Sequence, residues 1–134
     1  MVDLEKMRFL INRQPRLWWD IEKEEAKATK ITTTLTGMPR GSGNHSQVED
    51  GAIRLATLKE VYGETLAELE RMRNELDPLI SMLDDPDDRA VMRLRYIKGY
   101  NINTIAESIH RSERCIYYYL SRAEDKISRL QQNA

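Results

Sequence analysis

NINTIAESIHRSERCIYYYLSRAEDKISRL, residues 101–130, decides the fold because it contains two helical patterns separated by a tight turn. Asn101 and Ser112 are natural N-cap residues for helices over residues 102–109 and from residue 113 onward. The apolar residues recur at the spacing of one buried helical face: Ile105, Ala106 and Ile109 in the first helix, and Ile116, Leu120, Ala123, Ile127 and Leu130 in the second. Two helices joined by about three residues form a helix-turn-helix, whose second helix can enter a major groove.

The outward face of the second helix carries side chains suited to reading bases. At roughly 100° per residue, this face consists of Arg114, Tyr117, Tyr118 and Ser121. Arg114 can offer a bidentate fork to guanine, and Glu113 near the helix start can accept a hydrogen bond from cytosine. Ser121 and the tyrosines can hydrogen-bond to bases or contact a thymine methyl group. We therefore expect base readout by Glu113, Arg114, Tyr117, Tyr118 and Ser121.

Cations and hydroxyls around the two helices are expected to contact phosphates and to fix the register on DNA. These residues are Arg95, Lys98, Thr104, Arg111, Ser112, Arg122 and Lys126. Three other residues of the motif are interpreted as structural. Tyr119 points toward the core, Cys115 lies at its flank, and His110 occupies the turn, where a left-handed backbone conformation is needed.

A third helix is predicted just before this pair. Asp85-Pro86-Asp87-Asp88 supplies an N-cap side chain, a proline suited to the first helical position, and two carboxylates at the positive end of the helix dipole. The acidic run also suggests a divalent-metal site, but no other ligand group stands nearby, so the helix start is favoured. Gly99 ends the helix, because glycine tolerates a left-handed C-terminal cap. Residues 84–134 are therefore expected to form a three-helix domain.

Residues 1–83 are expected to form a helical hairpin or coiled-coil arm. A helical pattern runs from residue 3 to about residue 35, and a stretch without periodicity predicts a loop over residues 36–50. A heptad seam follows, with steps of three and four residues: Leu55, Leu58, Tyr62, Thr65, Leu69, Met72, Leu76, Leu79 and Leu83. Either the first helix folding back or a second copy of the chain covers this seam. The hairpin within one chain is favoured, and a homodimer through leftover apolar surface is the alternative.

Two prolines and a tryptophan pair stand out in this arm. Pro15 is expected to separate two helical pieces or to bend one helix, and Pro78 to end or kink the helix of the heptad seam. Trp18 and Trp19 are interpreted as packing against a neighbouring helix, with an interaction hot spot as the alternative.

The composition excludes several classes of protein. The 134 residues include 21 Lys and Arg against 22 Asp and Glu, yet residues 89–129 hold nine basic and only four acidic side chains, which is a weak footprint of nucleic-acid binding. One cysteine forms no internal disulfide, and two histidines cannot complete a Cys/His zinc set. No phosphate loop or nucleophile–base pair stands out, so neither a cofactor nor enzymatic activity is expected. No membrane span or export signal is evident, so we expect a cytoplasmic protein.

The C-terminal sequence resembles the region-4 helix-turn-helix of sigma-70-type factors. The resemblance lies in Arg89-Ala-Val-Met-Arg-Leu-Arg-Tyr-Ile-Lys-Gly-Tyr-Asn-Ile-Asn-Thr-Ile-Ala, continued by Ser112-Glu-Arg-Cys-Ile and Ser121-Arg-Ala. With Ala28-Thr-Lys-Ile, Leu35-Thr-Gly-Met-Pro-Arg-Gly-Ser-Gly and Val48-Glu-Asp, the whole chain is similar to small phage-encoded regulators of the RinA and ArpU type. The chain departs from that pattern at His110, where glycine is common, and at Cys115, where a large aromatic is common.

This resemblance implies a DNA-binding activator of late or packaging genes of a phage or prophage, which works with host RNA polymerase in a bacterial cell. Two alternatives stay open at the level of sequence. One is the small subunit of a packaging terminase, which also combines a helix-turn-helix with a helical oligomerisation region. The other is an interaction module that binds RNA polymerase and does not bind DNA.

Overall fold

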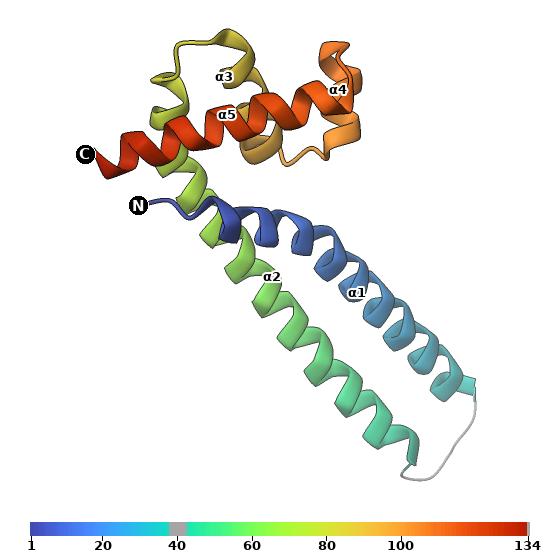
Figure 1. Ribbon diagram of the computed structural model, residues 1–134. Helices are drawn as coiled ribbons and strands as arrows, with labels where there is room; N and C mark the ends of the chain where they lie inside the picture. Colours follow the sequence, from blue (N-terminus) through green and yellow to red (C-terminus); the bar gives the residue numbers. More distant parts are fainter. Residues whose placement is uncertain (38–42, 134) are drawn as a thin grey trace. The chain divides into compact units, whose positions relative to one another are not determined.

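The chain folds into helices alone over the residues that the structure describes, which confirms the predicted all-α class. The computed structural model describes residues 1–37 and 43–133, with side chains placed for residues 1–29 and 49–133. Its elements follow in the order α1 (Leu4–Gly37), α2 (Gly43–Ser81), α3 (Pro86–Met92), the π-helical segment η1 (Arg93–Ile97), α4 (Ile102–Ile109) and α5 (Glu113–Gln132) (Figure 1). Within the described ranges, none of these helices is long and apolar enough to cross a bilayer.

The helices form two compact units. The head unit contains residues 1–11 and 69–134, and the hairpin unit contains residues 12–68. This division differs from the boundary expected near residue 83, because the first turns of α1 and the last turns of α2 pack with the C-terminal helices. The chain therefore passes between the units twice, once within α1 and once within α2.

The head unit is built around one apolar core. Helix α5 packs against α3 and α4, and the ends of α1 and α2 complete the same cluster. Its fully covered apolar side chains are Met7, Leu69, Leu76, Ile80, Val91, Met92, Tyr96, Ile105, Ile116, Ala123 and Ile127. Each buried Val, Leu, Ile or Met side chain among them contributes roughly 1.5–3 kcal/mol to the free energy of unfolding relative to an exposed one. This core fixes which face of α5 remains outside.

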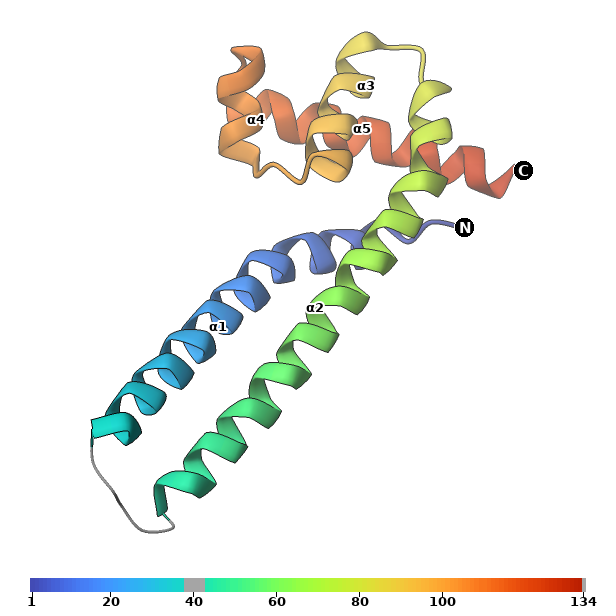
Figure 2. The ribbon, with the colours of Figure 1, turned by 180° about the vertical axis from the view of Figure 1, so that it is seen from behind.

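The hairpin unit consists of α1 and α2 running antiparallel. Trp18 lies against Tyr62 with ring centroids 5.5 Å apart, and Lys59 Nζ lies 3.1 Å from Glu25 Oε1. Because the later residue on α1 meets the earlier residue on α2, the two helices have opposite directions, as Figures 1 and 2 also show. Here the heptad seam faces α1 of the same chain, and Thr65 is buried in it.

The predicted loop over residues 36–50 was placed too broadly. Helix α1 continues to Gly37, and α2 already begins at Gly43, so residues 43–50 are helical rather than irregular. Residues 38–42 lie outside the described residues. Asn, His, Ser and Gln are weaker helix formers than Ala but do not break a helix, and extending an existing helix costs less than nucleating one. Composition alone therefore overstated the loop.

Neither proline ends its helix. Pro15 lies within α1 and Pro78 within α2, and both helices continue past these positions. A proline in a helix removes one backbone hydrogen bond and crowds the preceding turn. Burial of Leu17 and Ile21 after Pro15, and of Ile80 after Pro78, favours continuing each helix beyond its proline.

The helix predicted between Asp85 and Gly99 changes geometry halfway. After α3, residues 93–97 form the wider turns of η1, in which the Lys98 N–H donates to the Arg93 carbonyl oxygen at 2.9 Å. Arg73 Nε on α2 donates to the Tyr96 carbonyl oxygen at 2.8 Å, so a side chain satisfies one backbone acceptor of the wide turn. Burial lowers the pKa of Arg73 below its ordinary value. Gly99 then ends the segment with φ of +76°, as the sequence predicts.

We expect Gly99→Ala to destabilise the head unit. A left-handed conformation costs a residue with a Cβ about 1–2 kcal/mol, and the added Cβ would lie 3.4 Å from Arg73 Nη2. Gly51→Ala is the matched control, because Gly51 lies inside α2 and an added Cβ meets only the end of Arg54 at 3.9 Å. That control is expected to leave stability unchanged or raise it by up to about 1 kcal/mol. Urea denaturation measures both, and equal effects would contradict the account of Gly99.

Candidate nucleic-acid interface

Helices α4 and α5 are joined by the three residues between Ile109 and Glu113. Asn101 Oδ1 accepts a hydrogen bond from the Thr104 N–H at 2.8 Å, and Ser112 Oγ accepts one from the Cys115 N–H at 3.2 Å. His110 ends α4 in the left-handed region, with φ 56° and ψ 47°. Both caps and the turn thus lie where the sequence predicts them. Because the side chains of Asn101 and Ser112 accept hydrogen bonds from the free backbone N–H groups at the starts of α4 and α5, the turn is short and well defined.

The two faces of α5 differ sharply. Its core face is buried at Ile116, Leu120, Ala123 and Ile127, while Cys115 and Tyr119 are half-buried beside it. On the opposite side Tyr117 and Tyr118 are 60% and 62% exposed. All five residues predicted for base readout are exposed: Glu113, Arg114, Tyr117, Tyr118 and Ser121. The structure therefore brings this set together on the first two and a half turns of one helix.

The residues predicted for phosphate contact separate into two groups. Lys98, Arg111 and Ser112 are exposed, and Thr104 is half-buried at the start of α4. Arg95 is buried instead, and its Nη1 donates to the Tyr100 carbonyl oxygen at 3.2 Å. That position does not suit contact with a phosphate, because the guanidinium is buried and hydrogen-bonded to the backbone just after η1. Arg122 and Lys126 are half-buried and face carboxylates of the same unit.

Asp88 is the carboxylate on which Arg122 and Lys126 converge. Its side chain has no exposed surface, and its Oδ1 accepts from Arg122 Nη2 at 2.7 Å and from Arg122 Nε at 3.0 Å. Lys126 Nζ donates to Asp88 Oδ2 at 3.2 Å, and Arg122 Nη2 also donates to Asp85 Oδ2 at 2.8 Å. Two cations on α5 are thus tied to two carboxylates at the start of α3. The sequence interpretation of Asp88 as a helix-dipole charge misses this ion-pair cluster.

Arg122 also lies over two tyrosine rings. Its guanidinium carbon is 5.3 Å from the ring centroid of Tyr118 and 5.4 Å from that of Tyr119. The hydrogen bonds to Asp88 raise the pKa of Arg122, so the group stays charged. A cation held in this position attracts the faces of both rings. Arg122 therefore restrains Tyr118 at the edge of the exposed face.

A second polar cluster joins α1, η1 and α5 inside the head unit. Arg8 Nη1 donates to Tyr96 Oη at 2.9 Å, and Tyr96 Oη donates to Glu124 Oε1 at 2.5 Å. Burial raises the pKa of Tyr96, which keeps the phenol protonated as a donor. The hydrogen bond to Tyr96 raises the pKa of Arg8. These partners are far apart in the sequence, so no local pattern could have indicated them.

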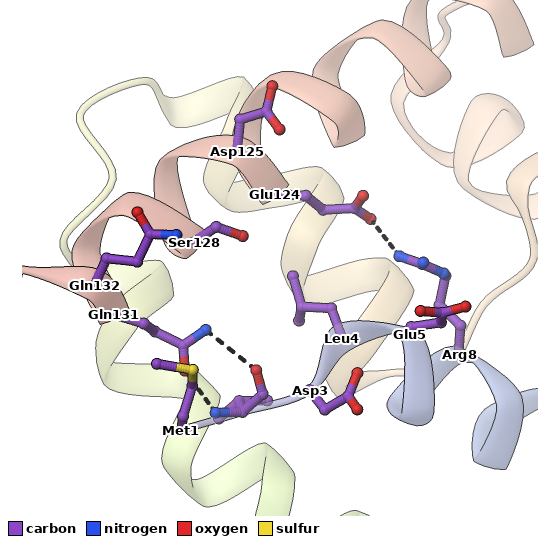
Figure 3. Close-up of a pocket in the computed structure, with 11 residues that line it drawn as sticks. Met1, Asp3, Leu4, Glu5, Arg8, Glu124, Asp125, Ser128, Gln131 and Gln132 are labelled. Atoms are coloured by element: carbon purple, nitrogen blue, oxygen red, sulfur yellow. Dashed lines mark hydrogen bonds and ion pairs between the residues drawn. The ribbon is translucent and has the colours of Figure 1, made fainter.

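An open pocket of about 550 Å³ lies beside this cluster, between the N-terminal residues and α5 (Figure 3). The Val2 N–H donates to Gln131 Oε1 at 2.5 Å, and Gln131 Nε2 donates back to the Val2 carbonyl oxygen at 3.1 Å. The pocket is lined partly by carboxylates, including Asp3, Glu5 and Asp125. None of the predicted DNA-contacting residues lines it. An acidic lining is unsuited to a polyanion, so the pocket is separate from the candidate interface.

Comparison with known proteins adds one result. Residues 31–128 match the family described as protein of unknown function, DUF1492. The chain belongs to this family. The DUF1492 match spans the end of α1 and all of α2, α3, η1 and α4, and it ends within α5 beyond the exposed tyrosines. No curated protein and no solved structure matched the chain.

We expect Asp88→Asn to destabilise the head unit by roughly 2–4 kcal/mol. Removing one partner of a fully buried ion pair costs roughly 3–5 kcal/mol, and the partial exposure of Arg122 and Lys126 reduces this figure. Asp87→Asn is the matched control on the same helix turn, with an expected loss below about 1 kcal/mol from the helix dipole. Chemical denaturation followed by circular dichroism compares the two. A loss at Asp88 no larger than at Asp87 would contradict the role of the cluster.

Asp85 gives a pH-dependent prediction. The Asp87 N–H, which donates to Asp85 Oδ1 at 2.8 Å, and then the charge of Arg122 hold the pKa of Asp85 below its ordinary value of 3.8. Its ionised form therefore stabilises the fold above about pH 3.8, and this contribution is lost as the pH falls through the lowered pKa. Asp85→Asn retains an N-cap acceptor but removes the charge. We expect the stability difference from the wild type to shrink between neutral pH and about pH 2, measured by urea denaturation. A difference independent of pH would refute this role.

Proposed function

We propose that this DUF1492 protein is a sequence-specific DNA-binding regulator of transcription, with α4 and α5 acting as a helix-turn-helix. The observation that carries the proposal is the exposure of Arg114, Tyr117 and Tyr118 on the face of α5 opposite its core residues. Two adjacent exposed tyrosines side by side with an arginine suit the polar and methyl-bearing edges of base pairs. In this proposal the N-terminal half of α5 enters the major groove.

Each exposed side chain has a distinct role in this arrangement. Arg114 donates two hydrogen bonds to one guanine, and Glu113 accepts from a cytosine. Tyr117, Tyr118 and Ser121 contact neighbouring bases or thymine methyl groups. Lys98, Arg111, Ser112 and Thr104 contact phosphates on either side, which fixes the register of the helix without reading sequence.

Arg122 and Lys126 act differently from the sequence-based expectation. Their charges are engaged by Asp88 and Asp85, so we assign them to holding α5 rather than to contacting phosphates. Through its contact with the ring, Arg122 holds Tyr118 in position on the exposed face of α5. Arg95 likewise supports the end of η1. Fewer phosphate contacts predict a shallower salt dependence than the basic composition of residues 89–129 would suggest.

The cellular setting of the proposal rests on the resemblance to RinA- and ArpU-type regulators. It is activation of late or packaging genes of a phage or prophage, together with host RNA polymerase, in the bacterial cytoplasm. The protein then works by binding and not by catalysis, and the exposed face of α5 needs no cofactor for it.

The direct test selects bound duplexes from a random DNA pool and then measures affinity by fluorescence anisotropy. Arg114→Ala is expected to weaken binding to the selected site by about 1–3 kcal/mol, or roughly 5- to 150-fold, and to relax the preference at one base position. Lys98→Ala is expected to weaken binding to all duplexes alike and to reduce the slope of log affinity against log salt concentration by about 1.

Arg129→Ala is the matched control, because Arg129 is an exposed arginine about four turns further along the same helix. It is expected to leave base preference unchanged. Equal losses for Arg114→Ala and Arg129→Ala, or recovery of no preferred sequence, would overturn the assignment of α5 as the reading helix.

A further inference from the structure

The hairpin unit covers its apolar seam poorly. Among its described side chains, only Leu17, Ile21 and Thr65 are buried, whereas Leu55, Leu58 and Tyr62 remain half-buried. Two helices alone can bury only one stripe on each partner, so side chains flanking that stripe stay in water. This exposed remainder is a physical reason for a further partner along these residues.

Part of the exposed remainder lies on one side of the hairpin, whereas Trp19 and Ile53 are exposed elsewhere on it. On α1, Trp18, Glu22 and Glu25 follow at steps of four and three residues, and on α2, Leu55, Lys59, Tyr62 and Leu66 follow at steps of four, three and four. The contacts Trp18–Tyr62 and Glu25–Lys59 place these two stripes on the same side. We call this surface the hairpin face. Trp18 is 50% and Leu66 38% exposed on it.

The opposite charges on the two stripes indicate what covers the hairpin face. The α1 stripe is acidic at Glu22 and Glu25, and the α2 stripe is basic at Lys59. A two-fold axis parallel to the helices would lay α1 of one copy over α2 of the other at the same level along the hairpin. Lys59 of each chain, which already pairs with Glu25 of its own chain but stays 55% exposed, then also meets Glu22 and Glu25 of the other chain. Trp18 meets Tyr62 and Leu66. The surface is therefore complementary to itself.

We propose that a second copy of this chain docks on the hairpin face and that the two hairpins form a four-helix bundle. Pairing α1 with α2 of the partner keeps neighbouring helices antiparallel, which is the usual arrangement of such bundles. A partner of a single charge would meet Lys59 with attraction but Glu22 and Glu25 with repulsion, or the reverse. The inference concerns residues 12–68 only and does not rest on DNA binding.

The test measures the mass of the full-length chain by sedimentation equilibrium across a dilution series, without DNA. The wild type is expected to have twice the chain mass at high concentration and to dissociate on dilution. Trp18→Glu and Leu66→Glu are each expected to weaken dimerisation at least about tenfold, because they place a charge at the centre of the apolar contact. Circular dichroism checks that each variant keeps its helical content.

The chain offers a closely matched control in Trp19→Glu. Trp19 is 52% exposed, but it lies against Arg16 and Lys23 of its own helix, with cation-to-ring distances of 5.9 Å and 5.0 Å, away from the hairpin face. This variant is expected to dimerise like the wild type. Lys59→Glu is expected to weaken the dimer, and adding Glu25→Lys to it is expected to restore the dimer, because the double variant exchanges the two charges of the pair both within each hairpin and across the proposed interface.

A monomeric wild type at all concentrations, or a closed ring of many copies, overturns the proposal. The proposal is also overturned if Trp19→Glu weakens dimerisation as much as Trp18→Glu does, or if the charge exchange fails to recover dimerisation. Because the measurement contains no nucleic acid, a failure to find a DNA site leaves its outcome unaffected.

Discussion

The buried carboxylate of Asp88 constrains the rest of the head unit. A carboxylate without solvent contact is costly unless cations and hydrogen bonds surround it, and here both cations come from α5, more than 30 positions later in the chain. The start of α3 and the middle of α5 must therefore meet in one register. That register places the apolar residues of α5 over the core and leaves its tyrosines outside. The ion-pair cluster acts on the candidate interface by orienting the helix that carries it.

This constraint changes how the charge of the C-terminal segment should be interpreted. The surplus of basic residues over positions 89–129 suggests a broad cationic surface, yet several of those cations are occupied within the unit. Arg122 and Lys126 face Asp88, Arg95 closes a helix end, and Arg93 pairs with Asp77. The exposed cations that remain are Lys98, Arg111 and Arg114 near the turn, and Arg129 about four turns further along α5. Recognition would then depend more on base contacts at Arg114 and the tyrosines than on phosphate neutralisation, which favours specificity over nonspecific affinity.

Local signals predicted local structure well. The caps at Asp85, Asn101 and Ser112 and the left-handed residues Gly99 and His110 follow from side-chain chemistry within a few residues, so the sequence was sufficient for them. The exposed face of α5 followed from helical periodicity. Contacts between distant residues were not predictable in this way: the partners of Asp88, the Arg8–Tyr96–Glu124 cluster and the wide turn of η1 depend on tertiary packing. The loop over residues 36–50 was predicted too long, because residues that are common in turns also occur within a helix when the helix continues from the residues beside them.

Both units have to cover the apolar faces of their helices, and they differ in how far they achieve it. In the head unit, six helical segments converge, so their apolar faces cover one another and the described polar groups inside are paired. In the hairpin unit, two helices leave Trp18 and Leu66 half in water, and the cover must come from elsewhere or be missing. Opposite charges on α1 and α2 already serve the single hairpin, where Lys59 Nζ lies 3.1 Å from Glu25 Oε1. A two-fold related copy would extend this pairing across the interface and cover Trp18 and Leu66 at the same time, so one arrangement accounts for both the charges and the exposed apolar side chains.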